Sequence, residues 1–288
     1  MARGTYLVGR VLFAVALVGF GVLCLVFGDT VHQLQPMDVL LSESTPMYGV
    51  LALATGAFLV VAGLAIAGDV APHPLATALT AFLALWIAVL QVPSAFVDPG
   101  LLRSPWWVRT FETLALTGGS LVVAGRTSRP ERERWIRVGR LLFGVSLPVF
   151  GVLHFVYAES TASLVPDFYP WPLIWIYVTG LGNVAAGVAI ATGVLSRLAA
   201  VLAGAMYGVY ALTLHSPRAA STYIPQLLAG DPAVLQDSRA GLTSLFVAVG
   251  MWGVAWIVAG STPRRSPGGA VPDRPGGETE VSEPEDPP

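Results

Sequence analysis

The sequence predicts an all-α, polytopic membrane protein whose eight transmembrane helices form two parallel-repeat four-helix bundles. Three observations lead to this fold class. The 288 residues are 54% hydrophobic and 12% charged, with mean hydropathy +0.67, which is more apolar surface than a soluble domain of this length can bury. Eight segments are long and apolar enough to cross the roughly 30 Å hydrocarbon core of a bilayer. Finally, the second half of the chain repeats the first.

The eight predicted spans each contain about 20 mostly apolar residues. No small-residue cleavage site follows the first span, so we expect a retained helix and not a removed signal peptide. The fourth span is the weakest because Glu112 interrupts it. In order, the spans are residues 8–28, 46–67, 74–94, 107–125, 139–157, 172–194, 197–214 and 240–260.

The distribution of arginine predicts that both termini are cytoplasmic. Of the 16 basic residues, all arginine, twelve fall on the side of the N-terminus and four on the other side. Cytoplasmic segments carry such an excess of basic residues. The linker RTSRPERERWIR at 126–137 gives the strongest signal. Residues 261–288 are rich in proline, glycine and acidic residues, which predicts a disordered cytoplasmic tail.

An internal duplication organises the chain into two units. Residues 9–27 match residues 139–157 at 11 of 19 positions, where shared apolar composition would give about one or two matches. Residues 54–68 match residues 178–192 at eight of 15 positions. Four spans per copy is an even number, so both copies enter the bilayer from the same side. We predict a diverged first unit at 1–127 and a second unit at 128–260.

The second copy is richer in hydrogen-bonding and titratable side chains. Its His154, Asn183 and His215 align with Cys24, Leu59 and Gln91 of the first copy. Polar groups in a membrane span are costly and usually face the bundle interior or a cavity. We infer that the second unit keeps a site, whereas the first has drifted toward a scaffold.

The predicted topology puts this site near the outer face of the membrane. His154, His215 and Glu112 lie within about one helical turn of that face, Asn183 lies deeper, and the outer loop after the fifth span holds Glu159 and Asp167. Each residue also has a structural interpretation. His154 can bond a backbone carbonyl or Tyr207, and His215 can cap a last turn. Glu112 can reach the headgroups or pair with Arg109, and Asn183 can join two helices.

The second copy resembles the DoxX-like family of membrane proteins over about residues 137–260. The likeness rests on GRLLFGV at 139–145, FGVLHF at 150–155, LVP at 164–166, TGLGNVAAG at 179–187, SRLAA at 196–200 and HSP at 215–217. The first copy fits more loosely. The resemblance implies a four-helix unit in a bacterial or archaeal inner membrane, and some relatives are subunits of thiosulfate–quinone oxidoreductase. The family often has an acidic residue where this chain has Asn183, which argues against a proton-coupled role there.

The first functional hypothesis is a quinone-linked membrane oxidoreductase subunit. His154, His215 and Glu112 are its candidate catalytic residues, because a histidine with an ordinary pKa of about 6.5 suits proton exchange. Asn183, Tyr207, Tyr210 and Trp175 are the candidate cofactor-binding residues of an apolar slot. Cys24 is the only cysteine, so electrons must pass through a quinone, a haem or a partner chain. We disfavour haem ligation by the two histidines, because lone histidine pairs are usually structural.

Two other functions stay open. One is binding or transport of a lipid or small hydrophobic solute in the same cavity without chemistry. The other is a scaffold for a membrane complex, with the arginine-rich linker and the acidic tail as contact points. The predicted partners are the lipid bilayer and a redox or scaffold protein. Nucleic acid is excluded as a partner because no basic arm or groove motif is present, and no metal site is predicted.

Overall fold

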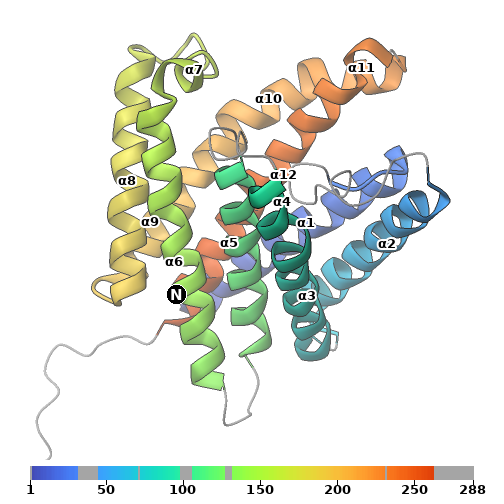
Figure 1. Ribbon diagram of the computed structural model, residues 1–288. Helices are drawn as coiled ribbons and strands as arrows, with labels where there is room; N and C mark the ends of the chain where they lie inside the picture. Colours follow the sequence, from blue (N-terminus) through green and yellow to red (C-terminus); the bar gives the residue numbers. More distant parts are fainter. Residues whose placement is uncertain are drawn as a thin grey trace, which may run out of the picture.

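The computed structural model describes residues 2–31, 45–70, 72–97, 106–126, 132–230 and 232–262, and every regular element in these ranges is a helix (Figure 1). The first half holds α1 (Ala2–Phe27), α2 (Pro46–Gly68), α3 (Pro72–Trp86), η2 (Ile87–Gln91), α4 (Val92–Val97) and α5 (Trp106–Ala124). The second half holds α6 (Arg132–Val156), α7 (Ala158–Ala162), α8 (Pro172–Thr192), α9 (Ser196–Val209), η4 (Tyr210–His215), α10 (Ser216–Arg218), η5 (Ala219–Tyr223), α11 (Ile224–Ala229) and α12 (Pro232–Ser261). The η segments are π-helical.

Seven continuous helical stretches of the described residues are long and apolar enough to cross a membrane, and they overlap seven of the eight predicted spans. One is α3 with η2, and another runs from α9 through α11 to Ala229, beyond the predicted end at residue 214. Three of the seven begin six or more residues before their predicted spans, at Ala2, Arg132 and Pro232, because a hydropathy window finds the hydrocarbon stretch whereas backbone hydrogen bonds continue past it. Apolar side chains on the outer faces suit contact with lipid. Leu64, Leu181 and Leu202, for example, are 60%, 64% and 59% exposed.

The predicted fourth span is the helix α5, which is not among the seven. Its 19 residues include Arg109, Glu112, three threonines and a serine, and the four hydroxyl side chains are buried between α3, α6 and α12. The hydroxyls of Thr113, Thr117 and Ser120 each donate to a backbone carbonyl one turn earlier. Thr113 also accepts from Gln91 at 2.8 Å. A helix surrounded by other helices does not need a lipid-compatible surface, which explains its low hydropathy.

Glycine pairs set the closest helix crossings. At the crossing of α5 and α6, a Cβ on Gly118 would lie 2.6 Å from the carbonyl oxygen of Gly139, and a Cβ on Gly139 would lie 2.5 Å from that of Gly118. The crossing of α1 and α12 repeats this arrangement with Gly9 and Gly253, at 2.7 and 2.8 Å. Any side chain at these positions would force the backbones apart. At the crossing of α6 and α8, a Cβ on Gly151 would lie 2.5 Å from the carbonyl oxygen of Gly180. The most extensive helix interfaces, α1 with α12 and α6 with α8, are therefore built on small residues.

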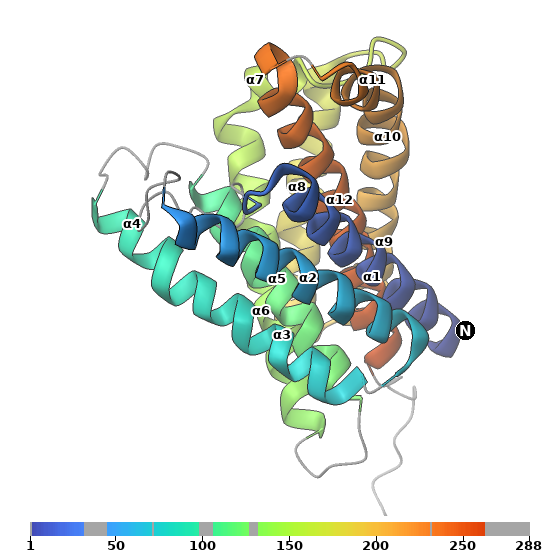
Figure 2. The ribbon, with the colours of Figure 1, turned by 90° about the vertical axis from the view of Figure 1, so that its right-hand side faces the viewer.

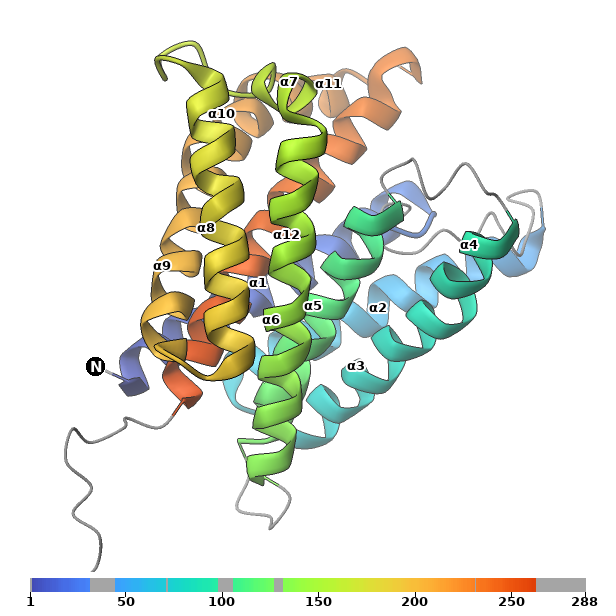
Figure 3. The same ribbon diagram turned by 60° about the vertical axis from the view of Figure 1, so that its left-hand side comes forward.

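The described ends of the chain lie at the same end of the bundle. The start of α1, the end of α12 and the turn between α8 and α9 are together at the bottom of Figures 1 and 3. At the opposite end are α7 and α11 (Figure 2). Which end faces the cytoplasm stays a prediction. Residues 263–288 of the predicted tail lie outside the described residues.

An ion pair holds the far end of α1 against α12. The carboxylate of Asp29 accepts hydrogen bonds from Arg239, the Tyr48 hydroxyl and the backbone N–H of Thr30. Arg239 also donates to the Thr30 carbonyl oxygen. Burial alone would raise the pKa of Asp29, but the bonds from Arg239 and Tyr48 favour the charged form and hold its pKa below the ordinary value.

Candidate functional site

A cavity of about 700 Å³ opens among the helices of the second half and α5. Its volume falls within the roughly 300–1,000 Å³ of typical small-molecule sites. Walls come from α5, α6, α8, α9, η4 and α12, and residues of α7 and the loop before α8 form a roof. The lining is mainly apolar and includes Phe150, Leu153, Ile176, Met206, Val247 and Met251.

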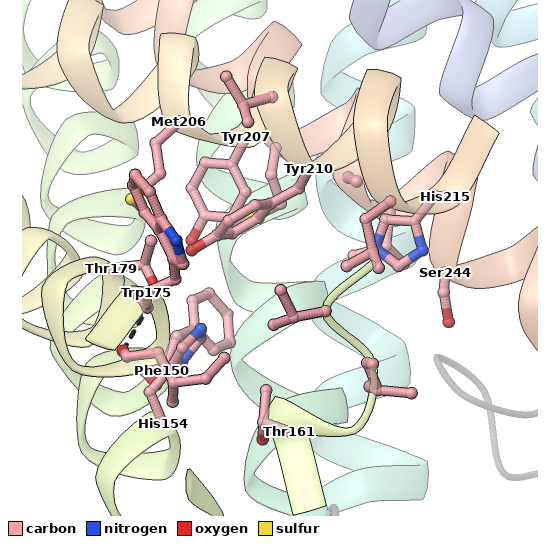
Figure 4. Close-up of a pocket in the computed structure, with 18 of the residues that line it drawn as sticks. Phe150, His154, Thr161, Trp175, Thr179, Met206, Tyr207, Tyr210, His215 and Ser244 are labelled. Atoms are coloured by element: carbon pink, nitrogen blue, oxygen red, sulfur yellow. Dashed lines mark hydrogen bonds between the residues drawn. The ribbon is translucent and has the colours of Figure 1, made fainter. Parts of the chain in front are cut away.

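Six of the seven predicted site residues line this cavity. They come from five segments of the chain, and in Figure 4 His154 and Phe150 lie across from Tyr207 and Tyr210, while His215 lies beside Ser244. The six residues are Glu112, His154, Trp175, Tyr207, Tyr210 and His215. The structure thus brings together side chains that are up to 103 positions apart in the sequence (112 to 215), although their chemical roles stay predictions.

His154 uses one ring nitrogen for structure and leaves the other unused. Its Nδ1 donates to the carbonyl oxygen of Phe150, one turn earlier, at 2.7 Å. A carbonyl oxygen can only accept, so Nδ1 carries the proton and Nε2 of the neutral ring is an acceptor. No described residue forms a hydrogen bond with Nε2. The structural interpretation of His154, a bond to a backbone carbonyl, therefore accounts for Nδ1 alone. The other structural partner considered, Tyr207, donates its hydroxyl to Asn183 instead.

Asn183 is the exception among the predicted residues, because the cavity wall does not include it. It is fully buried, its amide nitrogen donates to the carbonyl oxygen of Thr179 at 3.1 Å, and its Oδ1 accepts from the Tyr207 hydroxyl at 2.8 Å. These are the bonds of a residue that joins α8 to α9. The geometry does not support its assignment as a ligand contact, and it instead fixes the orientation of Tyr207.

Aromatic rings form one wall and the mouth of the cavity. Tyr207 and Tyr210 meet edge to face with ring centroids 5.6 Å apart. The Tyr210 hydroxyl is buried and has no hydrogen-bond partner among the described residues. Trp175 is 42% exposed, which places it at the mouth, and its Nε1 donates to the carbonyl oxygen of Pro170 at 2.9 Å. Tyr169 of the roof packs on Trp175 and donates to Thr213 of η4 at 3.2 Å, so it ties the roof to the wall.

Glu112 and His215 complete the polar lining without partners of their own. Neither side chain forms a hydrogen bond or salt bridge with the residues that the structure describes, and Arg109 makes no salt bridge with Glu112. His215 makes no capping bond within the same ranges. It ends the π-helix η4, and the consecutive residues Thr213, Leu214 and His215 all line the cavity. Single π-helical turns occur frequently at functional sites.

Sequence reasoning missed the roof and part of the wall. Tyr157, Thr161 and Tyr169 of the roof lie outside or at the ends of the predicted spans, and Met206 resembles any other core residue. The acidic loop residues, Glu159 and Asp167, are exposed and do not reach the cavity. Among the lining residues that were missed, Thr179 was the one that the sequence could have indicated, because it is a polar residue present in both copies. Across the described residues, no group of three or more His, Cys, Asp or Glu side chains could hold a metal ion.

A second, polar recess of about 460 Å³ meets the cavity at Ser244. Thr222, Tyr223, Gln226 and Asp237 line it, between η5, α11 and α12. Because Ser244 belongs to both linings, the polar recess touches the apolar cavity beside His215 (Figure 4).

Comparison with known proteins gives one partial match. Residues 142–222 match the model of a family described as a domain of unknown function, DUF8561. The matched segment runs from α6 to η5 and contains every predicted site residue except Glu112. No curated protein and no solved structure matches the chain.

Proposed function

We propose that this chain is a multi-pass inner-membrane protein that binds a small ring-bearing amphipathic molecule, of the quinone class, in the cavity of its second half. The observation that carries the proposal is the composition of the cavity. Apolar and aromatic walls enclose about 700 Å³, and His154 Nε2 and the Glu112 carboxylate face that space without hydrogen-bond partners among the described residues. Apolar pockets with a few convergent polar groups are the usual form of a ligand site.

The internal duplication supports this assignment to the second half. A π-helical turn ends at Gln91 in one half and at the aligned His215 in the other. The glycine crossings at Gly118–Gly139 and Gly9–Gly253 also correspond, each joining the last long helix of one half to the first helix of the other. These matches favour the arrangement of two parallel four-helix repeats, and with it the proposed likeness to DoxX-like proteins.

In the first half, larger side chains occupy two positions that line the cavity in the second half and one position beside them. Phe58, Phe82 and Trp86 align with Gly182, Met206 and Tyr210 at an offset of 124 residues. The three aromatic rings pack against one another, Phe58 edge to face with Phe82 and Phe82 tilted against Trp86, with centroid distances of 4.9 and 4.4 Å. In the second half, a Cβ on Gly182 would lie 3.4 Å from the Met206 sulfur, so the two residues occupy neighbouring positions but fill less volume. The difference supports a retained site in the second half and a filled scaffold in the first.

As an oxidoreductase subunit, the protein would reduce a bound quinone to the hydroquinone with two electrons from a partner redox protein and two protons. His154, His215 and Glu112 are the proposed proton-exchanging groups, because they are the titratable side chains that line the cavity within its described walls, apart from tyrosines. Tyr207, Tyr210 and Trp175 hold the ring. Asn183 acts through Tyr207 and is a positioning residue.

The test is extraction in mild detergent, followed by mass analysis of bound small molecules and by binding of 2-decyl-1,4-benzoquinone to the protein in nanodiscs. Met206→Phe introduces the aromatic residue of the first half and should abolish quinone binding. Leu202→Phe, one turn earlier on α9 and facing outward, is the matched control and should bind as wild type does. Equal binding by both variants would contradict the proposal.

Binding of a lipid or other hydrophobic solute is the second candidate, and the largely apolar lining favours it. The same extraction separates the two: a co-purified lipid with no affinity for the benzoquinone supports this alternative. An empty protein that co-purifies with another chain supports the scaffold.

A further inference from the structure

The cavity presents a hydrogen-bond acceptor at a fixed place. The bond from His154 Nδ1 to the Phe150 carbonyl fixes the tautomer, so Nε2 faces a ligand as a lone pair. This bond lies within one helix and does not depend on the ligand. Rotating the ring to offer an N–H instead would break it and leave the Phe150 carbonyl without that donor.

Neither of two other polar groups of the lining, Glu112 and Tyr210, is held as a hydrogen-bond donor in the way that His154 is held as an acceptor. The Glu112 carboxyl accepts hydrogen bonds when it is ionised and donates one only when it is protonated, and a hydroxyl such as that of Tyr210 can either donate or accept. The Tyr210 hydroxyl is buried in the same wall without a partner among the described residues. The site can therefore satisfy a ligand group that donates, whereas a group that only accepts has no fixed donor at His154.

We propose that the cavity selects rings that carry a hydroxyl donor, phenols and hydroquinones, over rings of the same size that carry only acceptors. This inference rests on the proposed function, since it specifies which redox form of the ring is bound. A hydroquinone hydroxyl donates to His154 Nε2. A quinone carbonyl in the same place brings two acceptors together, and both stay unpaired in an apolar cavity.

The expected preference is large enough to measure. Leaving a buried polar group unpaired weakens binding by about tenfold or more, and sites built around a substrate hydroxyl reject analogues that lack it. Tighter binding of the reduced form also raises the potential of the bound ring, by about 30 mV for each tenfold of preference in a two-electron couple. The site would therefore stabilise the reduced product and not the oxidised ring.

The experiment compares three ligands with one decyl tail: the 1,4-hydroquinone, its dimethyl ether and the 1,4-benzoquinone. Affinities are measured by calorimetry on the full chain in nanodiscs, without oxygen, at pH 8, above the ordinary imidazole pKa of about 6.5. Wild type should bind the hydroquinone at least about tenfold more tightly than the other two. His154→Phe should reduce all three to a similar affinity.

His73→Phe is the matched control. The Nδ1 of His73 also bonds a backbone carbonyl, that of Ala124 at 2.7 Å, but His73 does not line the cavity, so its replacement should leave the preference intact. Equal affinity of wild type for hydroquinone and benzoquinone would overturn this inference while the proposed function stands. Failure of all three ligands to bind would overturn the proposed function itself. The comparison of the three ligands on the wild-type protein does not depend on whether any variant folds.

Discussion

The bond between Asn183 and Tyr207 allows a quantitative test of how the second half is built. Asn183→Leu removes the acceptor of a fully buried hydroxyl, and Tyr207→Phe removes the donor to a fully buried amide oxygen. An unpaired buried group costs about 1–3 kcal/mol, although hydrogen bonds between membrane helices average only about 0.6 and reach about 1.7 kcal/mol. We expect each single variant to lose about 1–2 kcal/mol of unfolding free energy.

The double variant should cost less than the sum of the single ones, with a coupling of about 1 kcal/mol, because it leaves neither group unpaired. The first half already carries apolar residues at these positions, since Leu59 and Leu83 align with Asn183 and Tyr207 and both are buried. Unfolding free energies of the four proteins come from SDS titration in mixed micelles, followed by circular dichroism. Additive costs, with coupling near zero, would refute the idea that this bond joins α8 to α9.

Three further variants test other parts of the account. Gly139→Ala should destabilise by about 1–3 kcal/mol because its Cβ would lie 2.5 Å from a backbone oxygen, whereas Gly49→Ala, with open space around it, should be neutral or stabilising in the same titration. Asp29→Asn should cost up to about 3 kcal/mol at pH 7; because the folded pKa of Asp29 lies below its ordinary value, that difference should persist above about pH 4 and shrink as the pH falls further. Ser244→Cys should react with a water-soluble thiol reagent through the polar recess, more slowly with ligand bound, while the buried Cys24 should not react. A pH-independent Asp29 difference, or an unreactive cysteine at 244, would count against the corresponding contact.

Apolar length was sufficient to predict most of the helices. Seven spans follow from it directly, because a run of about 20 apolar residues has few alternatives to a membrane helix. The status of α5 could not be predicted in this way, since Thr113 and Ser120 are tolerable only where other helices surround them. The pairing of helices was not predictable either, because the close contact of Gly9 with Gly253 is a tertiary contact that cannot be read from the sequence of either helix alone.

The candidate site was predictable where the two copies differ in polarity. His154 and His215 stand out because their aligned partners are Cys24 and Gln91, and membrane spans seldom hold such groups without cause. The cavity itself was not predictable, since it depends on small differences in side-chain volume, such as Met206 in place of a phenylalanine. The roof lies in a loop, where hydropathy carries no information on contacts.

The most direct measurement of the central claim is photocrosslinking in nanodiscs with a diazirine-labelled alkyl hydroquinone, followed by mapping of the modified peptides. The account predicts adducts within residues 150–179 and 206–215, suppressed by an excess of unlabelled hydroquinone. Adducts that fall only on outward-facing residues such as Leu181 and Leu202, or that persist in the presence of the competitor, would contradict it.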